Sequence, residues 1–338
     1  MMNVADFEHF RSLLLEREES LSEWLEDGAR PGAVETQKVR ELMTEIKDAL
    51  ARMERGSFGN CAACDGTVEM HRLEVQPIRQ ICLDCLSPDE RNRLEEELYL
   101  ASRIHRALLP QEVEQIDGYE LAVKSLAAHV VGGDYYDILA PANGGPARVV
   151  IADTMGKGLP AGLVMSNLQG ALRILAADIE SPAKLLSRLN HWLCRNIPVS
   201  HFVSMAIVAL QPGERSAHTL VHASAGHCPS ILARTDGSVE LLDSTGTVIG
   251  VHEDFTHIEE HYPMSPGDLL VLYTDGVTEA VNPHGGMFGD DRLADFVRAH
   301  RDRPTVELIE TLADEVLSFS DRPDFEDDFT VIALRKTL

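Results

Sequence analysis

The sequence predicts an α+β fold in which antiparallel sheets are covered by helices and are preceded by a helical hairpin and a four-cysteine module. Three observations support this prediction. Apolar residues recur at helical spacing near the start of the chain, four cysteines then fall within one short window, and short β-rich runs beyond it alternate irregularly with helical stretches. The irregular order excludes a simple βαβ repeat.

The composition is that of a folded protein with two or three domains. The chain has 338 residues, of which 44% are hydrophobic and 25% charged. Its net charge of −25 disfavours binding to nucleic-acid phosphates or anionic lipid, so we expect neither direct nucleic-acid binding nor a membrane partner. No run resembles a secretory signal or a membrane helix, so we expect a cytoplasmic protein.

Residues 1–55 are predicted to form a helical hairpin. Gly28, Pro31 and Gly32 interrupt an apolar pattern that is helical on both sides. The apolar positions before and after this break are Phe7, Phe10, Leu14, Leu21, Leu25, Val39, Leu42, Ile46, Ala49 and Met53. Facing stripes of this kind indicate an antiparallel coiled coil.

The next segment, residues 56–88, carries two Cys-x2-Cys pairs with the spacing of a zinc site: Cys61, Cys64, Cys82 and Cys85. Four thiolates can close a tetrahedron around one Zn²⁺ and leave no position open for chemistry, so a structural site is predicted. Cys194 and Cys228 lie singly in apolar surroundings.

The zinc segment, with the Gly-x-x-Gly-x-Cys lead-in from Gly56 and the Arg-Leu-Glu of 72–74, resembles the zinc finger of the DksA/TraR family. That family places acidic residues of its hairpin tip inside RNA polymerase. The tip here, residues 26–32, lacks the second aspartate of the family, which argues against RNA polymerase as a partner and favours a scaffold for dimerisation or sensing.

Residues 89–110 are predicted to form a linker helix with an apolar stripe of Leu94, Leu98, Ala101 and Leu108. Such a stripe can pair with a second copy, so a homodimer is expected, with a passive spacer as the alternative.

Residues 111–338 are predicted to form the α+β domain. The β-rich runs include 119–125, 148–152, 203–210, 219–223, 268–273 and 329–334. The helical stretches are about 159–177, 182–196, 290–300 and 304–318.

Four acidic segments end or flank the apolar runs of this domain. They contain Asp134 with Asp137, Asp153, Asp275, and Asp327 with Asp328. A single aspartate after a strand is usually a turn or cap residue. Four such carboxylates at one end of a sheet sandwich would repel one another unless cations lay between them, and hard oxygen ligands favour Mg²⁺ or Mn²⁺.

The ordered motifs of this domain resemble the SpoIIE/RsbU-type branch of the metal-dependent protein phosphatases (PPM, PP2C-like). They are Ala101-x-x-Ile104-x-x-x-Leu108-Leu109-Pro110, Val131-Gly-Gly-Asp134-Tyr-Tyr-Asp137, Ile151-Ala-Asp153-Thr-Met-Gly156-Lys-Gly158, Ala223-x-Ala225-Gly226-His227, Gly246-x-x-Ile249-Gly250, Tyr273-Thr-Asp275-Gly276-Val-Thr-Glu279 and Asp327-Asp328-Phe329-Thr330. The resemblance implies two packed antiparallel sheets flanked by helices (αββα) and hydrolysis of protein phosphoserine or phosphothreonine.

The resemblance also implies the site residues and the cofactors. Two Mn²⁺ or Mg²⁺ ions would be bridged by Asp153, with further ligands from the Thr154 carbonyl, Asp134, Asp275 and either Asp327 or Asp328, of which the family pattern favours Asp327. Asp134, Asp153, Asp275 and Asp327 would therefore be the catalytic carboxylates. The implied substrate is a phosphorylated anti-anti-sigma (STAS) protein of a partner-switching pathway, with the N-terminal module as a regulator.

Two rival functions are an RNA polymerase-binding regulator with an attached phosphatase domain and a catalytically inactive metal-binding scaffold. All four carboxylate positions of the family are occupied by aspartate, which argues against the inactive scaffold.

Single residues also bear on the site. Met155 stands where eukaryotic relatives have a histidine, and no arginine occupies their phosphate-binding position. His227 is interpreted as a turn or packing residue. Lys157 lies in a Gly-Lys-Gly segment without P-loop spacing, which argues against nucleotide binding but leaves a role in orienting substrate.

Overall fold

The structure is a computed structural model that describes residues 4–26, 33–111, 115–140, 145–198, 200–211 and 218–337. The chain divides into two compact units, Met1–Glu97 and Leu98–Leu338. The helix α4 (Pro88–Leu108) contains the boundary between them. The tip of the predicted hairpin, residues 27–32, lies outside the described residues.

The N-terminal unit begins with two helices that pack along their apolar stripes. Its further elements are short, and the bounds of all four are α1 (Val4–Glu26), α2 (Ala33–Glu54), α3 (Met70–Val75) and η1 (Leu83–Cys85). Phe10 and Leu14 of α1 are buried against Ile46 and Ala49 of α2, as the helical spacing predicts. The same apolar cluster continues into the cysteine module through Phe58.

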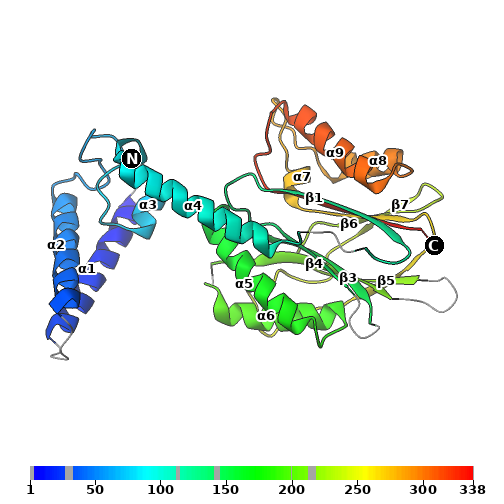
Figure 1. Cartoon of the computed structure of the whole chain (residues 1–338), viewed down its shortest axis with the longest axis horizontal. Coiled ribbons are helices and arrows are strands. Elements are labelled where there is room, and N and C mark those ends of the chain that lie inside the picture. Colours follow the sequence, from blue (N-terminus) through cyan, green and yellow to red (C-terminus); the bar gives the residue numbers. More distant parts are fainter. Residues whose placement is uncertain are drawn as a thin grey trace. The chain divides into compact units, whose positions relative to one another are not determined.

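The C-terminal unit contains two antiparallel five-stranded sheets (Figure 1). The first has the order β1-β10-β9-β6-β7, with bounds β1 (Tyr119–Leu126), β10 (Phe329–Lys336), β9 (Leu269–Tyr273), β6 (Ser230–Ala233) and β7 (Val239–Leu242). The second has the order β2-β3-β4-β5-β8, with bounds β2 (Tyr135–Leu139), β3 (Ala147–Thr154), β4 (Val203–Gln211), β5 (His218–Ala225) and β8 (Glu260–Met264).

Helices cover the outer face of each sheet, which gives four layers (Figure 1). The second sheet packs on α5 (Leu159–Leu175) and α6 (Pro182–Asn196). The first sheet packs on α8 (Asp290–His300) and α9 (Thr305–Ser320), next to the short helix α7 (Asp275–Thr278). The predicted fold class, an αββα sandwich preceded by a helical and four-cysteine module, is confirmed.

The strand β3 shows why strands of the sandwich appear as continuous apolar runs in the sequence. Val149 and Ile151 face the other sheet, whereas Val150 and Ala152 face α5 and α6. A strand that is buried on both faces needs apolar residues at successive positions. The run ends at Asp153, where the sheet reaches the edge that carries the acidic residues.

None of the helices in the described part of the chain is both long and apolar enough to cross a lipid bilayer.

Candidate active site and zinc centre

A pocket of about 510 Å³ opens at one edge of the sandwich, and three of the expected carboxylates line it. Asp153 stands near the end of β3, Asp275 begins α7 directly after β9, and Asp327 precedes β10. The ends of three buried strands therefore bring residues from distant parts of the sequence to one cavity. Thr154 also lines it.

The fourth expected carboxylate, Asp134, is buried and does not line the pocket. The Thr274 hydroxyl donates a hydrogen bond of 2.8 Å to its Oδ2 atom. Burial and the neighbouring charges of Asp153 and Asp328 hold the pKa of Asp134 well above its usual range. Thr274 immediately precedes Asp275, so this bond ties the start of β2 to the end of β9.

The adjacent residues Asp327 and Asp328 differ in what they contact. The Asp328 carboxylate is buried and accepts hydrogen bonds from the backbone N–H groups of Ala128, at 2.8 Å, and Gly133, at 2.6 Å. The Asp327 Oδ2 atom lies 2.7 Å from Lys157 Nζ and faces the pocket. Asp328 thus fixes the loop before Asp134, and Asp327 is the member of the pair that faces the cavity.

The carboxylates of the pocket destabilise one another's charged forms. Burial, together with Asp275, Asp327 and Asp328, raises the pKa of Asp153 to about 7. Burial and the charges of Glu279 and Asp327 raise the pKa of Asp275. A divalent cation would relieve this repulsion, and carboxylate oxygens are the ligands that Mg²⁺ and Mn²⁺ prefer. The residues present therefore fit a site for hard cations.

Two glycines allow the loops around the pocket to converge. A Cβ atom on Gly133 would lie 2.9 Å from the Thr154 carbonyl oxygen, and one on Gly276 would lie 2.0 Å from that of Asp328. No side chain fits at these distances, so both positions require glycine.

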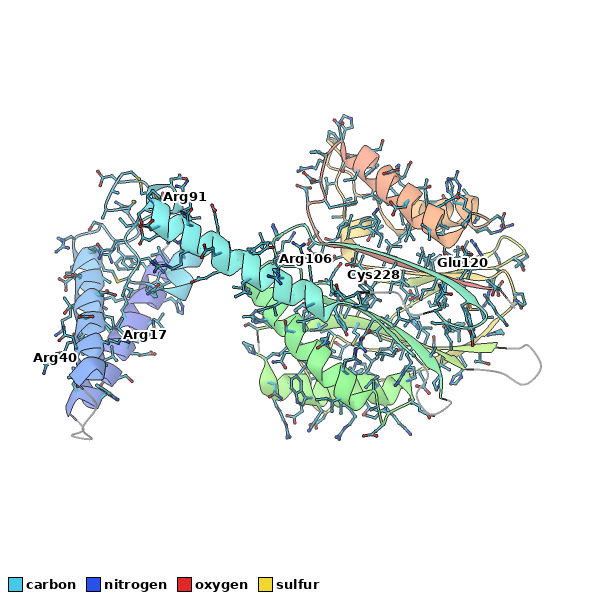
Figure 2. The ribbon with its side chains drawn as sticks, viewed as in Figure 1. Arg17, Arg40, Arg91, Arg106, Glu120 and Cys228 are labelled. Carbon is cyan, nitrogen blue, oxygen red and sulfur yellow. The ribbon has the colours of Figure 1, made fainter. Side chains whose placement is uncertain are left out.

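Sequence reasoning gave no role in the site to three pocket residues: Ser204, Glu279 and Cys228. Ser204 is paired with Asp153 across β3 and β4, and its Oγ lies 2.8 Å from Nδ1 of the buried His227. Cys228 follows in the segment that joins the sheets (Figure 2). Burial and the nearby charges of Asp275 and Asp290 raise its pKa to about 12. Only Glu279 had a signal, because it ends the motif that begins at Tyr273.

The four cysteines of the N-terminal unit form a second candidate metal site. The sulfur atoms of Cys61, Cys64, Cys82 and Cys85 all lie within 4.8 Å of one another, and those of Cys64 and Cys82 are 3.7 Å apart. A tetrahedral zinc site with Zn–S bonds of about 2.3 Å requires S–S separations of about 3.8 Å. Among the described residues, no other group of His, Cys, Asp or Glu ligand atoms converges so tightly.

Backbone groups prepare this cluster for a cation. The N–H groups of Cys82 and Ala63 donate to Cys61 Sγ at 3.3 and 3.4 Å and lower the pKa of that thiol to about 6. Donors directed at a sulfur favour the thiolate, which is the form that binds zinc. The cluster therefore fits the predicted structural Zn²⁺.

Comparison with protein families settles the family. The model of "Stage II sporulation protein E (SpoIIE)" matches residues 143–337, more than half of the chain. The chain belongs to the SpoIIE family. The model of the prokaryotic DksA/TraR C4-type zinc finger also matches this SpoIIE-family chain, over residues 56–91. Both resemblances inferred from the sequence are confirmed.

Similar proteins with curated names include two phosphoserine phosphatases of Bacillus subtilis. RsbU is 29% identical over 244 residues, which cover 72% of this chain and 71% of RsbU. RsbP is 26% identical over 224 residues, which cover 64% of this chain and 52% of RsbP. The prediction that the chain is a PP2C-type phosphatase is confirmed at the level of this enzyme class.

Two other comparisons concern parts of the chain. The SiaA-PP2C domain of Pseudomonas aeruginosa shares its fold with a TM-score of 0.64 at 24% identity, covering 73% of this chain and 98% of that domain. The RNA polymerase-binding transcription factor DksA of Escherichia coli is 35% identical over 46 residues, which cover 14% of this chain and 30% of DksA.

Proposed function

We propose that this SpoIIE-family chain hydrolyses phosphoserine or phosphothreonine on a protein substrate with the help of two Mn²⁺ or Mg²⁺ ions. The observation that carries the proposal is the convergence of Asp153, Asp275 and Asp327 on one pocket, where burial and the charges of the neighbouring carboxylates raise the pKa of Asp153 to about 7. The names of the relatives RsbU and RsbP support phosphoserine as the substrate.

In this proposal the pocket residues act as metal ligands. Asp153 would contribute to both ion sites, Asp275 and Asp327 would hold one ion, and the Thr154 carbonyl would add a further ligand. Asp134, which is buried outside the lining of the pocket, would also contribute a ligand. When bound, divalent cations supply an activated water and offset the charge of the phosphoryl group. Asp328 acts by holding the loop that carries Asp134, through its bonds to Ala128 and Gly133.

The remaining residues of the site orient the carboxylates. The Thr274 hydroxyl fixes one oxygen of Asp134. Ser204 and the buried His227 hold the strand opposite Asp153. Burial lowers the pKa of His227 to about 4, so its ring is neutral at pH 7 and provides no acid for the leaving group. With Met155 at the position of the eukaryotic histidine, we assign protonation of the leaving oxygen to water.

We propose a phosphorylated anti-anti-sigma (STAS) protein as the substrate, in a partner-switching pathway. The test is an assay of the full chain on such a phosphoprotein and on a phosphoserine peptide, with Mn²⁺ or Mg²⁺. Release of phosphate from both supports the chemistry, and a higher kcat/KM for the folded STAS protein supports the pathway. No release from either substrate with either ion would refute the proposal.

We propose that residues 1–55, 56–88 and 89–110 form a regulatory hairpin, zinc finger and linker in front of a phosphatase domain of residues 111–338, in a homodimer. Support for the dimer comes from the linker helix, where Tyr99, Leu100 and Ile104 are more than half exposed. These residues differ from the predicted stripe of Leu94, Leu98, Ala101 and Leu108, which is half-buried. Leu100→Asp would then lower the mass measured by light scattering from dimer to monomer. An unchanged mass would contradict this arrangement.

A second candidate function is regulation of transcription through RNA polymerase, which the zinc-finger match to DksA favours. Capture of core RNA polymerase by the full chain, and its loss in a Cys82→Ser variant, would support it. Absence of capture would leave the N-terminal module as a regulator of the phosphatase.

A further inference from the structure

Lys157 occupies a distinctive position beside the catalytic pocket. Among the described residues that line this pocket, it is the only one with a cationic side chain, whereas Asp153, Asp275, Glu279 and Asp327 all supply negative charge. A phosphate monoester carries negative charge of its own. Without a cation from the protein, the phosphoryl oxygens that point away from the metal ligands would face carboxylates.

The backbone around Lys157 is shaped by two glycines. Gly156 and Gly158 have φ angles of +98° and +70°, a region that residues with side chains rarely adopt. A Cβ atom at either glycine would meet nothing within 4 Å, so the requirement for glycine is conformational and does not arise from crowding. The chain therefore turns sharply on both sides of Lys157, between the end of β3 and the start of α5.

The side chain of Lys157 also lies on the border between two cavities. It lines the catalytic pocket and a neighbouring pocket of about 310 Å³, together with Glu279 and Asp327. Its Nζ atom is 2.7 Å from Asp327 Oδ2 and 3.4 Å from the Glu326 carbonyl oxygen. The ammonium group is therefore held between the two cavities by contacts with the segment before β10.

This ion pair is open to solvent and can be exchanged. The side chains of Lys157 and Asp327 are 52% and 37% exposed. Exposed pairs of this kind contribute little free energy, because water screens them and the flexible side chains lose entropy. A phosphoryl group offers the ammonium a more highly charged partner, and the lysine stem allows the group to move a short distance into the pocket.

We propose that Lys157 binds the phosphoryl group of the substrate, in place of the arginine that eukaryotic relatives use. The inference rests on the proposed phosphatase function and assigns this residue a direct contact with the substrate. The competing explanation is that Lys157 only holds the segment before β10 through Asp327 and Glu326.

The test measures binding of inorganic phosphate to the full chain with Mn²⁺ by calorimetry, and its inhibition constant. Lys157→Met should weaken phosphate binding by about 10- to 100-fold, the loss expected for a hydrogen bond to a charged group. The KM for a phosphoserine peptide should rise by a similar factor. Lys157→Arg should recover most of the affinity, because it restores a cation.

Arg322 provides a matched control. It lines only the neighbouring pocket, pairs with Glu326 at 2.6 Å and is half exposed, as Lys157 is. Arg322→Met should leave phosphate affinity unchanged. Equal losses in both variants would overturn the proposal, as would phosphate affinity within about twofold of the parent in Lys157→Met.

Two further measurements separate the explanations. If Lys157→Met lowers Mn²⁺ affinity by the same factor as phosphate affinity, the lysine acts on the metal site and the proposal is wrong. If the parent chain binds phosphate through Lys157 but hydrolyses no phosphoserine, the proposed function fails and the phosphate site stands.

Discussion

The backbone of Gly276, at the start of α7, lies against the carbonyl oxygen of Asp328. A Cβ atom on Gly276 would lie only 2.0 Å from that oxygen. The two segments that deliver Asp275 and Asp327 to the pocket therefore touch backbone to backbone. This contact sets the closest approach of the two segments, because a residue larger than glycine at position 276 would push α7 and the segment before β10 apart.

Replacing Gly276 by alanine should separate the two segments. We expect Gly276→Ala to lower the free energy of unfolding by about 1–3 kcal/mol, as overpacking does. Turnover should fall by a larger factor than the loss of folded protein explains, because the carboxylates of the pocket lose their spacing. Chemical denaturation and a phosphatase assay would measure both effects.

Gly170 in α5 is the control for this substitution, because a Cβ atom there would meet nothing within 4 Å. Gly170→Ala should raise the free energy of unfolding by roughly 0.5–1 kcal/mol through its higher helix propensity. If Gly276→Ala were as stable and active as the parent, the close contact would not govern the site.

Asp153→Asn should reduce turnover by orders of magnitude while the protein stays folded, because it removes a charge from the proposed bridging ligand. Asp275→Asn should behave alike. Chelation should abolish activity, and Mn²⁺ should restore it. Asp295→Asn is the control, since this carboxylate on α8 is exposed and pairs with Arg298. Turnover of Asp153→Asn within about threefold of the parent would refute the assignment.

The stability of the chain should depend on pH through His222, which is fully buried with Nε2 3.3 Å from Ser230 Oγ. Burial lowers its pKa from 6.5 to about 4, although the charge of Glu260 acts in the opposite direction. The folded protein thus keeps His222 neutral where the unfolded chain protonates it. The resulting stability is present above pH 6.5 and is lost as the pH falls towards 4.

The measurement compares melting temperatures of the parent and His222→Gln between pH 7.5 and 4.5. The change in melting temperature with pH must be compared between the parent and the variant. The buried carboxylates with raised pKa values stabilise the fold as the pH falls over this range, which is opposite to the effect of His222. The loss on acidification should be smaller in the variant. Parallel curves would show that His222 does not titrate as its burial requires.

The zinc centre should hold one Zn²⁺ per chain. Cys82→Ser should release the metal and loosen residues 56–86, because the binding free energy of a structural zinc is part of the folding free energy. The α+β unit should stay folded, with unchanged β-sheet circular dichroism. Cys194→Ser should keep its zinc, because Cys194 lies outside the cluster. Metal analysis that finds no zinc in the parent would contradict the assignment.

Most long apolar elements could be predicted from the sequence, whereas the short buried strands β2 and β6 were not among the predicted runs. The predicted helix 182–196 coincides with α6, and the run 203–210 lies within β4. The strands β7 and β8 could not be predicted, because they lie at sheet edges with mostly exposed or half-exposed residues, and β8 contains Pro263. Edge strands lack the burial that produces an apolar pattern.

The acidic residues of the site could be predicted as a group, but their separate contacts could not. The sequence does not show that Asp328 binds the backbone of Ala128 and Gly133 while its neighbour Asp327 faces Lys157. These differences arise from loops that meet across nearly 200 residues of sequence. Local spacing carries no information about such contacts.

The position of β10 has a consequence for protein synthesis. This strand follows all the other described strands in the sequence, yet it lies between β1 and β9 in the first sheet and comes directly after Asp327 and Asp328. Before the ribosome releases these residues, β1 lacks the one strand that pairs with it in the described part of the chain, and the loop before Asp134 lacks the Asp328 carboxylate that holds it. A nascent or prematurely terminated chain that ends before Asp327 therefore lacks part of the lining of the candidate pocket and cannot complete it.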